Sequence, residues 1–362
     1  MGRVRVGILF GGRSGEHEVS LASARSIVAA LDPDRFEPVL IGITKSGRWL
    51  RPADAVAALQ AGPDAAGGTP VDWAGDLRPV SAAGGALERT AVVVIFPVLH
   101  GPNGEDGTIQ GFLELAGVPY VGAGVLGSAL AMDKGAMKDV FRAHGLPTPA
   151  YELVRRAAWE ADRVGTLDRL EAAFGFPCFV KPCNLGSSVG ITKAHDRGEL
   201  IAAMDLAATY DRRIIVEAFV PHAREVECSV LGNDEPVASL PGEAIPPGEF
   251  YDYDAKYLDE RLVLEVPAKL PPGVTERIQE LAVRVFSALD LSGMARVDFF
   301  IRRDTGELLV NEANTIPGFT PTSMYPKMWE ASGLPFGKLV SRLVDLALQR
   351  ADDRARRRFD RG

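Results

Sequence analysis

The segment that most constrains the fold lies at residues 296–318, where two extended runs flank a tight turn. Apolar residues alternate with other residues over 297–301, and a second extended run covers 308–313. This is the period-2 pattern of β-strands. The linking residues 304–306 are polar and end in Gly306, which adopts a positive φ without steric cost. The pattern predicts a β-hairpin in this part of the chain.

The register of this hairpin decides which polar side chains meet. If the turn centres on Thr305, Asp298 lies opposite Glu312. Arg296 then lies opposite Asn314, and all four polar side chains share one face because strand side chains alternate between faces. The apolar residues expected on this face are Phe300 and Val310, and those expected on the opposite, packed face are Val297, Phe299, Ile301, Leu309 and Ala313.

Two interpretations of this polar face differ in their chemistry. Two carboxylates and an amide oxygen on one surface repel one another unless a cation lies between them. Hard oxygen ligands of this kind suit Mg²⁺, especially when substrate phosphates complete its octahedron. The simpler interpretation is an exposed polar face, which the hairpin alone favours. The rest of the chain changes this balance.

Length, charge and cysteine content exclude several classes of protein. The chain has 362 residues, which predicts two or three domains. Its formal net charge of -8 argues against a nucleic-acid partner. The 3 cysteines have neither CxxC nor zinc spacing, which is typical of reduced cytosolic thiols. No signal peptide or membrane-spanning apolar run is found, so we expect a cytoplasmic protein with no membrane partner.

The first part of the chain has the pattern of an open α/β sheet. An apolar strand over 4–10 leads into the glycine-rich segment 11–18 and a helical pattern over 19–31. Backbone N–H groups at such a strand–turn–helix opening are free to hold an anion. Further strands are expected at 39–43 and 91–99, with functional loops at the C-terminal ends of the parallel strands.

A second glycine motif, GAGVLG at 122–127, matches G-x-G-x-x-G after a short strand expected at 119–121. A dinucleotide site also needs an acidic residue about 20 positions further on. The corresponding region, 145–149, contains no acid. We therefore interpret the motif as a loop near a domain boundary and reject a dinucleotide-dependent dehydrogenase.

The segment 177–193 combines a strand, a glycine- and serine-rich loop and another strand. Small residues let the backbone approach phosphates, hydroxyls add donors, and Lys181 adds a point charge. The segment lacks the G-x-x-x-x-G-K-[ST] pattern of a P-loop, and a plain hairpin turn is the alternative interpretation. The strand expected at 213–219 places Glu217 before a short apolar stretch suited to presenting backbone groups to a nucleotide base.

The C-terminal part adds a long loop to the hairpin described above. After a strand expected at 225–231, the loop from about 237 to 262 carries YDYDAKY at 251–257. Loops this long inside compact domains are usually functional lids or disordered, and the aromatic density favours a lid. The remaining expected elements are helices at 275–289 and 337–348 and a solvated charged tail at 351–362.

Lysines near a glycine- and serine-rich loop, an acidic hairpin face and an aromatic lid together indicate ATP chemistry without a P-loop. In these features the chain resembles the D-alanine–D-alanine ligases of the ATP-grasp superfamily. The resemblance runs from about residue 4 to 345. The segments that carry it are GGRSGEHEVSL (11–21), HGPNGEDGTIQG (100–111), AMDK (131–134), VKPCNLGSSVG (180–190), YDYDAKY (251–257), ARVDFF (295–300) and NEANTIPGF (311–319). Cys183 stands where a residue such as alanine is expected, and the alanine-rich stretch 51–89 does not align.

The resemblance implies a three-domain ATP-grasp fold, α/β in class and α+β overall, with an open parallel sheet in its N-terminal domain. The implied domains are a substrate-binding α/β domain at 1–122, a central ATP-grasp domain at 123–221, and a C-terminal ATP-grasp domain at 222–362 with the lid loop and the metal site. A homodimer is implied as well.

The implied reaction joins two D-alanine molecules into D-alanyl-D-alanine for peptidoglycan precursor synthesis. The first D-alanine carboxylate attacks the γ-phosphate of ATP, which yields an acyl phosphate and ADP. The amine of the second D-alanine attacks the acyl carbonyl, and the tetrahedral intermediate expels phosphate. ATP is the co-substrate, two Mg²⁺ or Mn²⁺ ions are the cofactors, and a monovalent cation is compatible with the family.

Residue by residue, the resemblance assigns roles to the matching positions. The metal ligands are Asp298, Glu312 and Asn314. The nucleotide contacts are Lys134, Lys181, Ser188, Glu217, Ala218, Phe219, Val220, Glu225, Lys256 and Phe300. The first substrate is assigned to Glu16 and His100, the tetrahedral oxyanion to Arg296 and the N–H of Gly318, and the second substrate to Ser323 and Met324. The hydrogen-bonded set that closes the lid is Glu16, Ser187 and Tyr257, with Ser188 as the alternative to Ser187.

Two rival functions share part of this pattern. Another ATP-dependent carboxylate–amine ligase, of the glutathione-synthetase or carboxylase type, would have the metal face but would not need the motifs at 11–20 and 251–257. A nucleotide-binding regulatory protein without turnover is disfavoured because it tends to lose catalytic charges. The charges retained here are Lys181, Lys256, Arg296, Asp298 and Glu312, together with the amide of Asn314.

Tyr257 bears on the choice of second substrate. Relatives that use D-lactate lack the tyrosine of this lid motif, and the tyrosine is present here. We therefore expect D-alanine to be preferred over D-lactate at neutral pH. The remaining histidines are interpreted as a helix-start residue, His17, and as surface residues, His144, His195 and His222.

Overall fold

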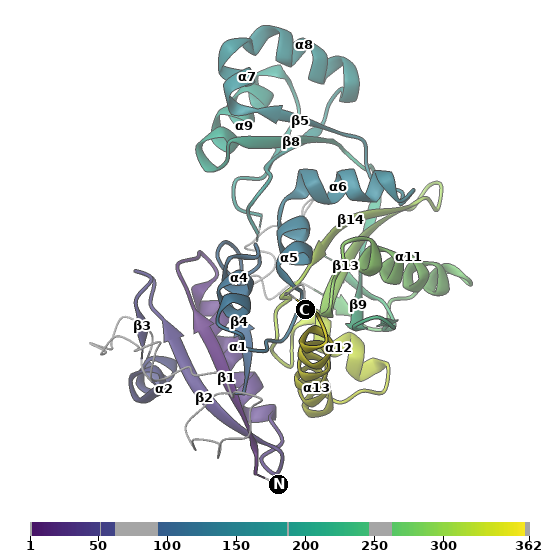
Figure 1. Cartoon of the computed structure of the whole chain (residues 1–362). Helices are drawn as coiled ribbons and strands as arrows, with labels where there is room; N and C mark the ends of the chain where they lie inside the picture. The colour runs from purple at the N-terminus through teal and green to yellow at the C-terminus, as the bar shows by residue number, and fades with distance from the viewer. Residues whose placement is uncertain (1, 51, 62–92, 187, 246–262, 359–362) are drawn as a thin grey trace.

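The computed structural model of the chain describes residues 2–50, 52–61, 93–186, 188–245 and 263–358. Within these residues it contains three β-sheets, each with helices packed on it (Figure 1). In that view the N-terminal sheet lies at the lower left, the sheet of the central part of the chain lies at the top, and the largest sheet lies between them and to the right.

The N-terminal sheet is largely parallel, as the sequence predicts. β1 pairs in parallel with β2 on one side and with β4 on the other, and the short β3 is antiparallel to β2. Its strands are, in spatial order, β3 (Trp49–Leu50), β2 (Phe36–Ile43), β1 (Val4–Gly11) and β4 (Val94–Val98). Its helices are α1 (His17–Ala30), α2 (Pro52–Ala61) and α4 (Thr108–Leu115). The strand expected at 119–121 is reduced to one parallel bridge between Ile95 and Tyr120.

The central sheet is antiparallel and carries its helices on one face. Its strands are, in spatial order, β5 (Tyr151–Arg155), β8 (Arg213–Ala218), β6 (Cys178–Pro182) and β7 (Thr192–Ala194). Its helices are α7 (Arg156–Ala161), α8 (Arg163–Phe174) and α9 (Arg197–Tyr210). Ile214 and Val216 of β8 pack into the core beneath these helices. Because strand side chains alternate, Ile215 and Glu217 face the opposite side, away from the helices.

The largest sheet is antiparallel, with its main core on one face and the two C-terminal helices over part of the other. Its strands are, in spatial order, β12 (Val263–Glu265), β11 (Gly242–Ile245), β9 (Ala223–Gly232), β13 (Gly293–Arg302) and β14 (Leu308–Asn314), with β10 (Val237–Ala238) paired to β9. The helices that share its main core are α5 (Val125–Met132), α6 (Lys134–Ala143) and α11 (Val274–Ala288). Val297, Phe299 and Ile301 of β13 are buried in that core, which places Arg296, Asp298 and Phe300 on the opposite, open part of the sheet. Met294, at the start of β13, is buried on that opposite side.

The hairpin of β13 and β14 has the predicted pairing at its polar end and a different register near its turn. Asp298 pairs with Glu312, but Phe299 pairs with Val310, so Asn311 is the extra residue of a β-bulge. The predicted faces of Val310 and Leu309 are therefore wrong: Val310 is buried in the core, and Leu309 pairs with Phe300 on the open face. An extra residue reverses the alternation of every position beyond it.

The C-terminal helices lie against the N-terminal part of the chain. These helices are α12 (Met324–Ala331) and α13 (Phe336–Ala355). Leu339 and Leu343 of α13 belong to the same buried cluster as Val6 and Ile8 of β1. α13 continues past the expected helix end at 348 as far as Ala355, and most of the described residues of the tail from 351 onward are exposed, as expected.

The end of α13 makes specific contacts with the N-terminal part. The Arg354 guanidinium forms an ion pair with Glu114 at 2.6 Å. Arg350 lies 4.3 Å from the centre of the Tyr120 ring. These contacts explain why the helix extends further than its apolar pattern predicts, since the arginines have partners there.

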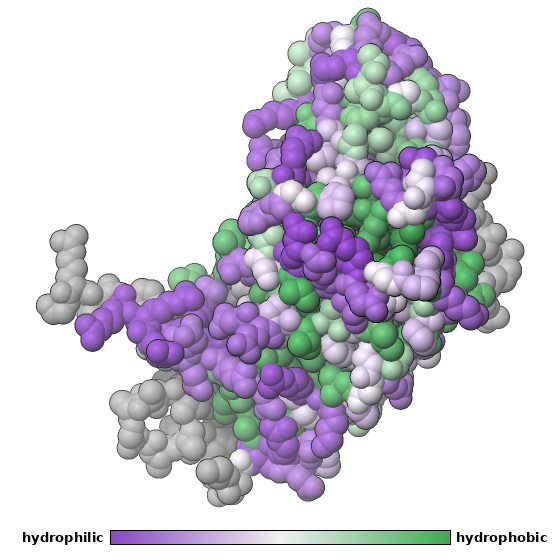
Figure 2. Space-filling model, turned by 90° about the vertical axis from the view of Figure 1, so that its right-hand side faces the viewer, coloured by the Kyte–Doolittle hydropathy of each residue, from purple (hydrophilic) through white to green (hydrophobic). Residues whose placement is uncertain are grey.

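On the surface shown in Figure 2, hydrophilic residues predominate and hydrophobic residues form separate patches. Among the described residues, no helix combines the length and the apolar character needed to cross a membrane.

Candidate functional site

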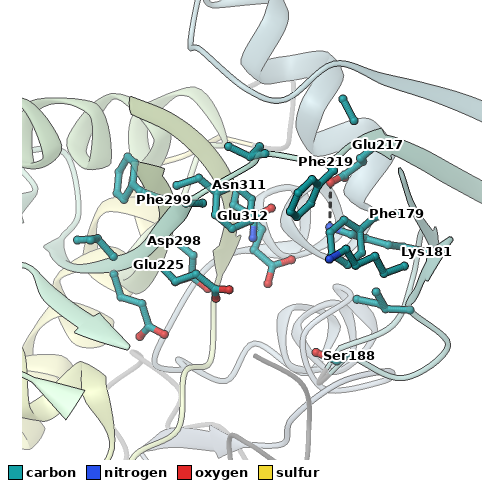
Figure 3. A pocket seen from close by; sticks show the side chains of 18 of the residues that line it. Phe179, Lys181, Ser188, Glu217, Phe219, Glu225, Asp298, Phe299, Asn311 and Glu312 are labelled. Carbon is teal, nitrogen blue, oxygen red and sulfur yellow. Dashed lines mark hydrogen bonds and ion pairs between the residues drawn. The ribbon is translucent and has the colours of Figure 1, made fainter. Parts of the chain in front are cut away.

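A cleft of about 510 Å³ lies between the open face of the central sheet and the open face of the largest sheet. The alternation of the strands directs their polar side chains into it, because their apolar neighbours face the helices. Its lining includes Phe179, Lys181, Ser188, Glu217, Ala218, Phe219, Val220, Glu225, Asp298, Phe300, Asn311 and Glu312. In Figure 3 the carboxylates of Asp298, Glu225 and Glu312 point into a common space, and Lys181 lies across it. A cleft of this size, lined by apolar groups and a few polar ones, is typical of a ligand site.

A buried ion cluster forms one wall of this cleft. Lys181 Nζ donates to Glu217 Oε2 at 2.8 Å, the contact drawn as a dashed line in Figure 3. Lys138 Nζ lies 3.4 Å from Glu217 Oε1. Burial opposes the charge of Glu217, but the two lysines outweigh it and lower the pKa of this carboxyl. Burial likewise opposes the charge of Lys181, but Glu217 and Glu312 raise its pKa. The wall therefore keeps one negative and at least one positive charge in place.

Lys138 is a member of this cluster that our sequence analysis missed. Its side chain is 1% exposed, and Nζ also donates to Thr148 Oγ1 and to the backbone oxygen of Asn311, each at 3.1 Å. The second contact holds the bulged residue next to Glu312. A sequence signal existed, because Lys138 lies four positions after Lys134 and therefore on the same helix face.

The hairpin face brings together the predicted metal ligands and Arg296. The guanidinium of Arg296 donates to both oxygens of Asp298, at 2.7 Å each, and lies 3.0 Å from Glu227. Asn314 Nδ2 donates to Asp298 Oδ2 at 3.0 Å. The predicted pairing thus places these groups on one face, with the arginine as an additional partner of Asp298.

The donor set of this face suits a hard cation that takes part of its shell from phosphate. Two carboxylates and an amide oxygen are oxygen ligands of the type Mg²⁺ prefers. In the part of the chain that the structure describes, no three His, Cys, Asp or Glu side chains gather in the manner of a self-sufficient metal centre. The residues therefore fit a cation whose remaining ligands come from a bound nucleotide and water.

The glycine- and serine-rich loop is anchored at its start. Asn184 Nδ2 donates to Asp133 Oδ2 at 3.1 Å, and the Asn184 N–H donates to Asp211 Oδ2 at 2.9 Å. Lys134 Nζ donates to the backbone oxygen of Leu185 at 2.5 Å and lies 4.0 Å from Glu312. Lys134 thus contacts the loop and approaches the metal face at the same time.

A second, smaller cavity of about 80 Å³ adjoins the first. Its lining includes Glu16, His100, Glu105, Lys134, Gly186, Ser188, Arg296, Glu312, Asn314 and Gly318. Ser188, Ile191 and Glu312 line both cavities. Groups predicted for the first substrate, the oxyanion and the metal therefore meet at the junction of the two.

His100 has a defined tautomer in this cavity. Its Nδ1 lies 2.9 Å from the backbone oxygen of Ile316, which only accepts, so Nδ1 carries the proton and donates. Burial lowers the pKa of His100 despite the charge of Glu16. Its Nε2 is then a lone-pair acceptor, and it has no hydrogen-bond partner among the residues that the structure describes.

Glu105 is a second residue that our sequence analysis missed. It belongs to the segment HGPNGEDGTIQG at 100–111, in which the sequence analysis assigned a role to His100 alone. Desolvation and the charge of Glu16 raise its pKa to about 8. Its hydrogen bonds join two distant loops and are described further below.

The remaining predicted residues differ in their placement. Ser323 and Met324 line neither cavity. Ser323 Oγ lies 3.2 Å from the position that a Cβ on Gly318 would occupy, whereas the Met324 side chain packs in a small core with Ala244 and Met328. A role of Met324 in ligand binding is therefore limited to its backbone. Ser187, Lys256 and Tyr257 lie outside the described residues.

Two further histidines, His17 and His222, lie in different environments. His17 does start α1, but it is fully buried, with Nδ1 2.7 Å from the backbone oxygen of Gly12. His222 is exposed, as predicted, and it lies at the larger cleft. The burial of His17 depends on the loop that packs against it, and hydrophobic pattern does not report such packing.

Comparisons with known proteins match the whole chain. A family model described as "D-ala D-ala ligase N-terminus" matches residues 5–123, and one described as "D-ala D-ala ligase C-terminus" matches residues 140–345. The chain is 50% identical over 363 residues to a D-alanine--D-alanine ligase of Heliobacterium modesticaldum, with 98% of each chain covered. It is 51% identical over 350 residues to that of Deinococcus radiodurans, covering 95% of this chain and 98% of the relative.

Solved structures show the same architecture. The D-alanine-D-alanine ligase from Coxiella burnetii matches with a TM-score of 0.84 and 37% identity, covering 98% of this chain and 97% of that one. A D-Ala:D-Ser ligase from Enterococcus faecalis matches with a TM-score of 0.81 and 37% identity, covering 96% of this chain and 100% of that one.

Proposed function

Because the chain belongs to the D-alanine–D-alanine ligase family, we propose that its two adjoining cavities bind ATP and two D-alanine molecules for the synthesis of D-alanyl-D-alanine. The chain is an ATP-dependent ligase of peptidoglycan precursor synthesis. The observation that carries the site assignment is the shared lining of the two cavities by Ser188, Ile191 and Glu312. A nucleotide in the larger cleft would present its terminal phosphate to a carboxylate in the smaller one.

The proposed nucleotide site uses the wall of the central sheet. The adenine lies along the apolar segment from Ala218 to Val220, where backbone groups can read its edge, and Glu225 takes the ribose. Lys181 and Lys134 face the phosphates, and Lys181 keeps its charge because Glu217 is ionised beside it. The positive charges of these two lysines reduce the repulsion between the triphosphate and the attacking carboxylate.

The proposed metal ligands are Asp298, Glu312 and Asn314. When bound, one or two Mg²⁺ or Mn²⁺ ions would supply charge neutralisation at the phosphates. Arg296 is already held by Asp298 at 2.7 Å, so the same carboxylate orients the arginine toward the smaller cavity. This arrangement keeps the guanidinium fixed before the oxyanion develops, which is the condition for electrostatic stabilisation.

The smaller cavity is the proposed amino-acid site. Glu16 accepts the ammonium of the first D-alanine, with the free lone pair of His100 Nε2 as an additional acceptor nearby. Arg296 and the N–H of Gly318 stabilise the oxyanion of the tetrahedral intermediate. Ser323 and the backbone of Met324 at the first turn of α12 take the carboxylate of the second D-alanine, because free N–H groups at a helix start attract anions.

Several assignments extend beyond the described residues. Lys256 is proposed for the γ-phosphate. Tyr257 and Ser187 are proposed to join Glu16 in the closed lid. We also propose the domain divisions 1–122, 123–221 and 222–362, a cytoplasmic location and a homodimer, all of which follow from the family.

The first experiment is phosphate release by purified protein with ATP and Mg²⁺, with D-alanine, L-alanine, D-serine or no amino acid present. We expect release that depends on D-alanine, with a product of the mass of D-alanyl-D-alanine. Fast release with L-alanine, or release without any amino acid, would contradict the assignment. The D-serine arm is included because a D-Ala:D-Ser ligase has 37% identity to this chain. If the main product were the mixed D-Ala–D-Ser dipeptide, the second substrate would be D-serine instead of D-alanine, and the assignment of the ATP chemistry would stand.

The second substrate is expected to be D-alanine in preference to D-lactate. At pH 7, with both offered at equal concentration, we expect the dipeptide to exceed the depsipeptide by at least roughly tenfold. The basis is Tyr257, which relatives that use D-lactate lack. The ratio of the two products, measured by mass spectrometry, gives the preference. Comparable yields of dipeptide and depsipeptide would contradict the prediction.

A further inference from the structure

The backbone of Ile316 is held on both of its polar groups by side chains from a distant loop. Its N–H donates to Glu105 Oε1 at 2.9 Å, and its C=O accepts from His100 Nδ1 at 2.9 Å. Glu105 and Ile316 are 211 positions apart in sequence. Ile316 lies two residues before Gly318, whose N–H is proposed for the oxyanion. Both contacts therefore act on the short segment that carries this donor.

The other oxygen of Glu105 fixes the opposite wall of the same cavity. Glu105 Oε2 accepts the N–H of Gly101 at 2.8 Å. Gly101 has a φ of +75°, and a Cβ there would lie 3.0 Å from Glu16 Oε2. The backbone at Gly101 thus packs directly against the carboxylate proposed to bind the substrate ammonium. One side chain thereby connects the ammonium site with the oxyanion segment.

We propose that Glu105 is a positioning residue that clamps the segment before Gly318 to the loop beside Glu16, and so sets the distance between the ammonium site and the oxyanion donors. This inference rests on the function proposed above for the smaller cavity. Glu105 does not line the larger cleft, so the clamp acts on the amino-acid side of the reaction. Misplacement of reacting groups by about 1 Å is enough to cost roughly 100-fold in rate.

The chemistry of the side chain supports this role. Both oxygens of a carboxyl group can accept a hydrogen bond, also when the group is protonated, because a hydroxyl oxygen keeps a lone pair. Glutamine would instead turn an NH₂ group, which only donates, toward one of the two backbone N–H donors. The surroundings of Glu105 oppose its negative charge. Desolvation and Glu16 raise the pKa of Glu105 to about 8, against its two backbone donors and Arg296. Neutral His100 adds no compensating charge.

The kinetic test compares Glu105→Gln with a matched control in the same loop, Asp106→Asn. Asp106 also accepts two backbone N–H groups, from Asn103 at 2.9 Å and Thr108 at 3.0 Å, but both lie within the loop. In E105Q we expect kcat to fall by roughly 10- to 100-fold with the KM for ATP unchanged. D106N should stay within about twofold of wild type in both parameters. An unchanged kcat in E105Q, a parallel rise in the KM for ATP, or an equal loss in D106N would each overturn the clamp.

A structural readout tests the clamp without turnover. By hydrogen exchange, a peptide covering residues 314–318 should exchange faster in E105Q, or in Glu105→Ala, than in wild type and D106N. Equal exchange in all four proteins would contradict the clamp. Because this measurement needs no substrate, absence of D-alanine-dependent turnover in the wild type would refute the proposed function and leave the clamp separately testable.

The pH dependence of stability gives a third readout. Below pH 4.5, the ordinary pKa of a glutamate side chain, Glu105 is protonated in both the folded and the unfolded protein. Between there and about 8 the unfolded chain loses this proton and the folded protein retains it, so stability is lost as the pH rises. E105Q lacks this titration. From about pH 5 to about pH 8 the thermal midpoint of wild type should fall relative to that of E105Q, and parallel curves would contradict the location of Glu105 between the two loops.

Discussion

Replacement of Asp298 by Asn, or of Glu312 by Gln, is expected to lower kcat by roughly 10²- to 10³-fold or more while the protein stays folded. Each change keeps the shape of the side chain and removes the charge that would hold a cation at the phosphates. Asp298 has a second role, because both of its oxygens accept from Arg296 at 2.7 Å. Its loss therefore also loosens the guanidinium proposed for the oxyanion, and we expect D298N to be the more severe of the two.

Phosphate release as a function of Mg²⁺ concentration measures this effect. The matched control is Asp304→Asn, a carboxylate in the turn of the same hairpin that pairs with Arg302 at the surface, away from both cavities. D304N should have wild-type turnover and wild-type Mg²⁺ dependence. A D298N protein with unchanged Mg²⁺-dependent activity would refute the metal assignment, and loss of the folded circular dichroism spectrum would show a structural role instead.

Glu217→Gln is expected to reduce the free energy of unfolding by about 3–5 kcal/mol. The Glu217 carboxylate is the direct partner of two buried lysines, Lys181 at 2.8 Å and Lys138 at 3.4 Å. Removal of its charge leaves Lys181 and Lys138 without their shared carboxylate in a site where neither lysine side chain is more than 9% exposed. Denaturant unfolding monitored by circular dichroism measures the loss.

A second substitution separates the charge effect from a packing effect. Adding Lys138→Met to E217Q removes one of the two lysines that have lost this partner, so the double variant should be more stable than E217Q alone. Glu199→Gln, which removes an exposed carboxylate that pairs with His195 at 2.8 Å, should leave the unfolding midpoint nearly unchanged. The single variant Lys138→Met is measured as well. If the double variant lost as much free energy of unfolding as the two single variants together, charge imbalance would not be the cause.

Local sequence pattern predicted those parts of the protein that depend on neighbours along the chain. The parallel N-terminal strands followed from apolar runs separated by a glycine-rich turn and a helix. The pairing of Asp298 with Glu312 followed from strand alternation on either side of a turn, and the structure confirms it. The motif order also led to the ligase family, which the comparisons confirm over the full length. Such features are legible because alternation, turn chemistry and motif spacing are short-range properties.

Local pattern was insufficient where one extra residue interrupts the alternation of a strand. The bulge at Asn311 moved Val310 into the core and Leu309 to the open face. The backbone oxygen of Asn311 accepts a hydrogen bond from Lys138, which lies on α6 at a separation of 173 positions. The alternation of apolar and polar residues in a seven-residue strand does not reveal a bulge, and it cannot indicate a hydrogen-bond partner so far away in the sequence.

The sequence by itself thus determined the family, the main strands that carry the site residues and several of the helices, because these follow from short-range periodicity and from motifs. Only the tertiary structure decided which charges meet. It brought Lys138 to Glu217, Glu105 to Ile316, and α13 to the N-terminal sheet. The physical reason is that burial and neighbouring charge, which shift the pKa of Glu105 to about 8 and hold Glu217 ionised, arise from packing between segments far apart in the chain.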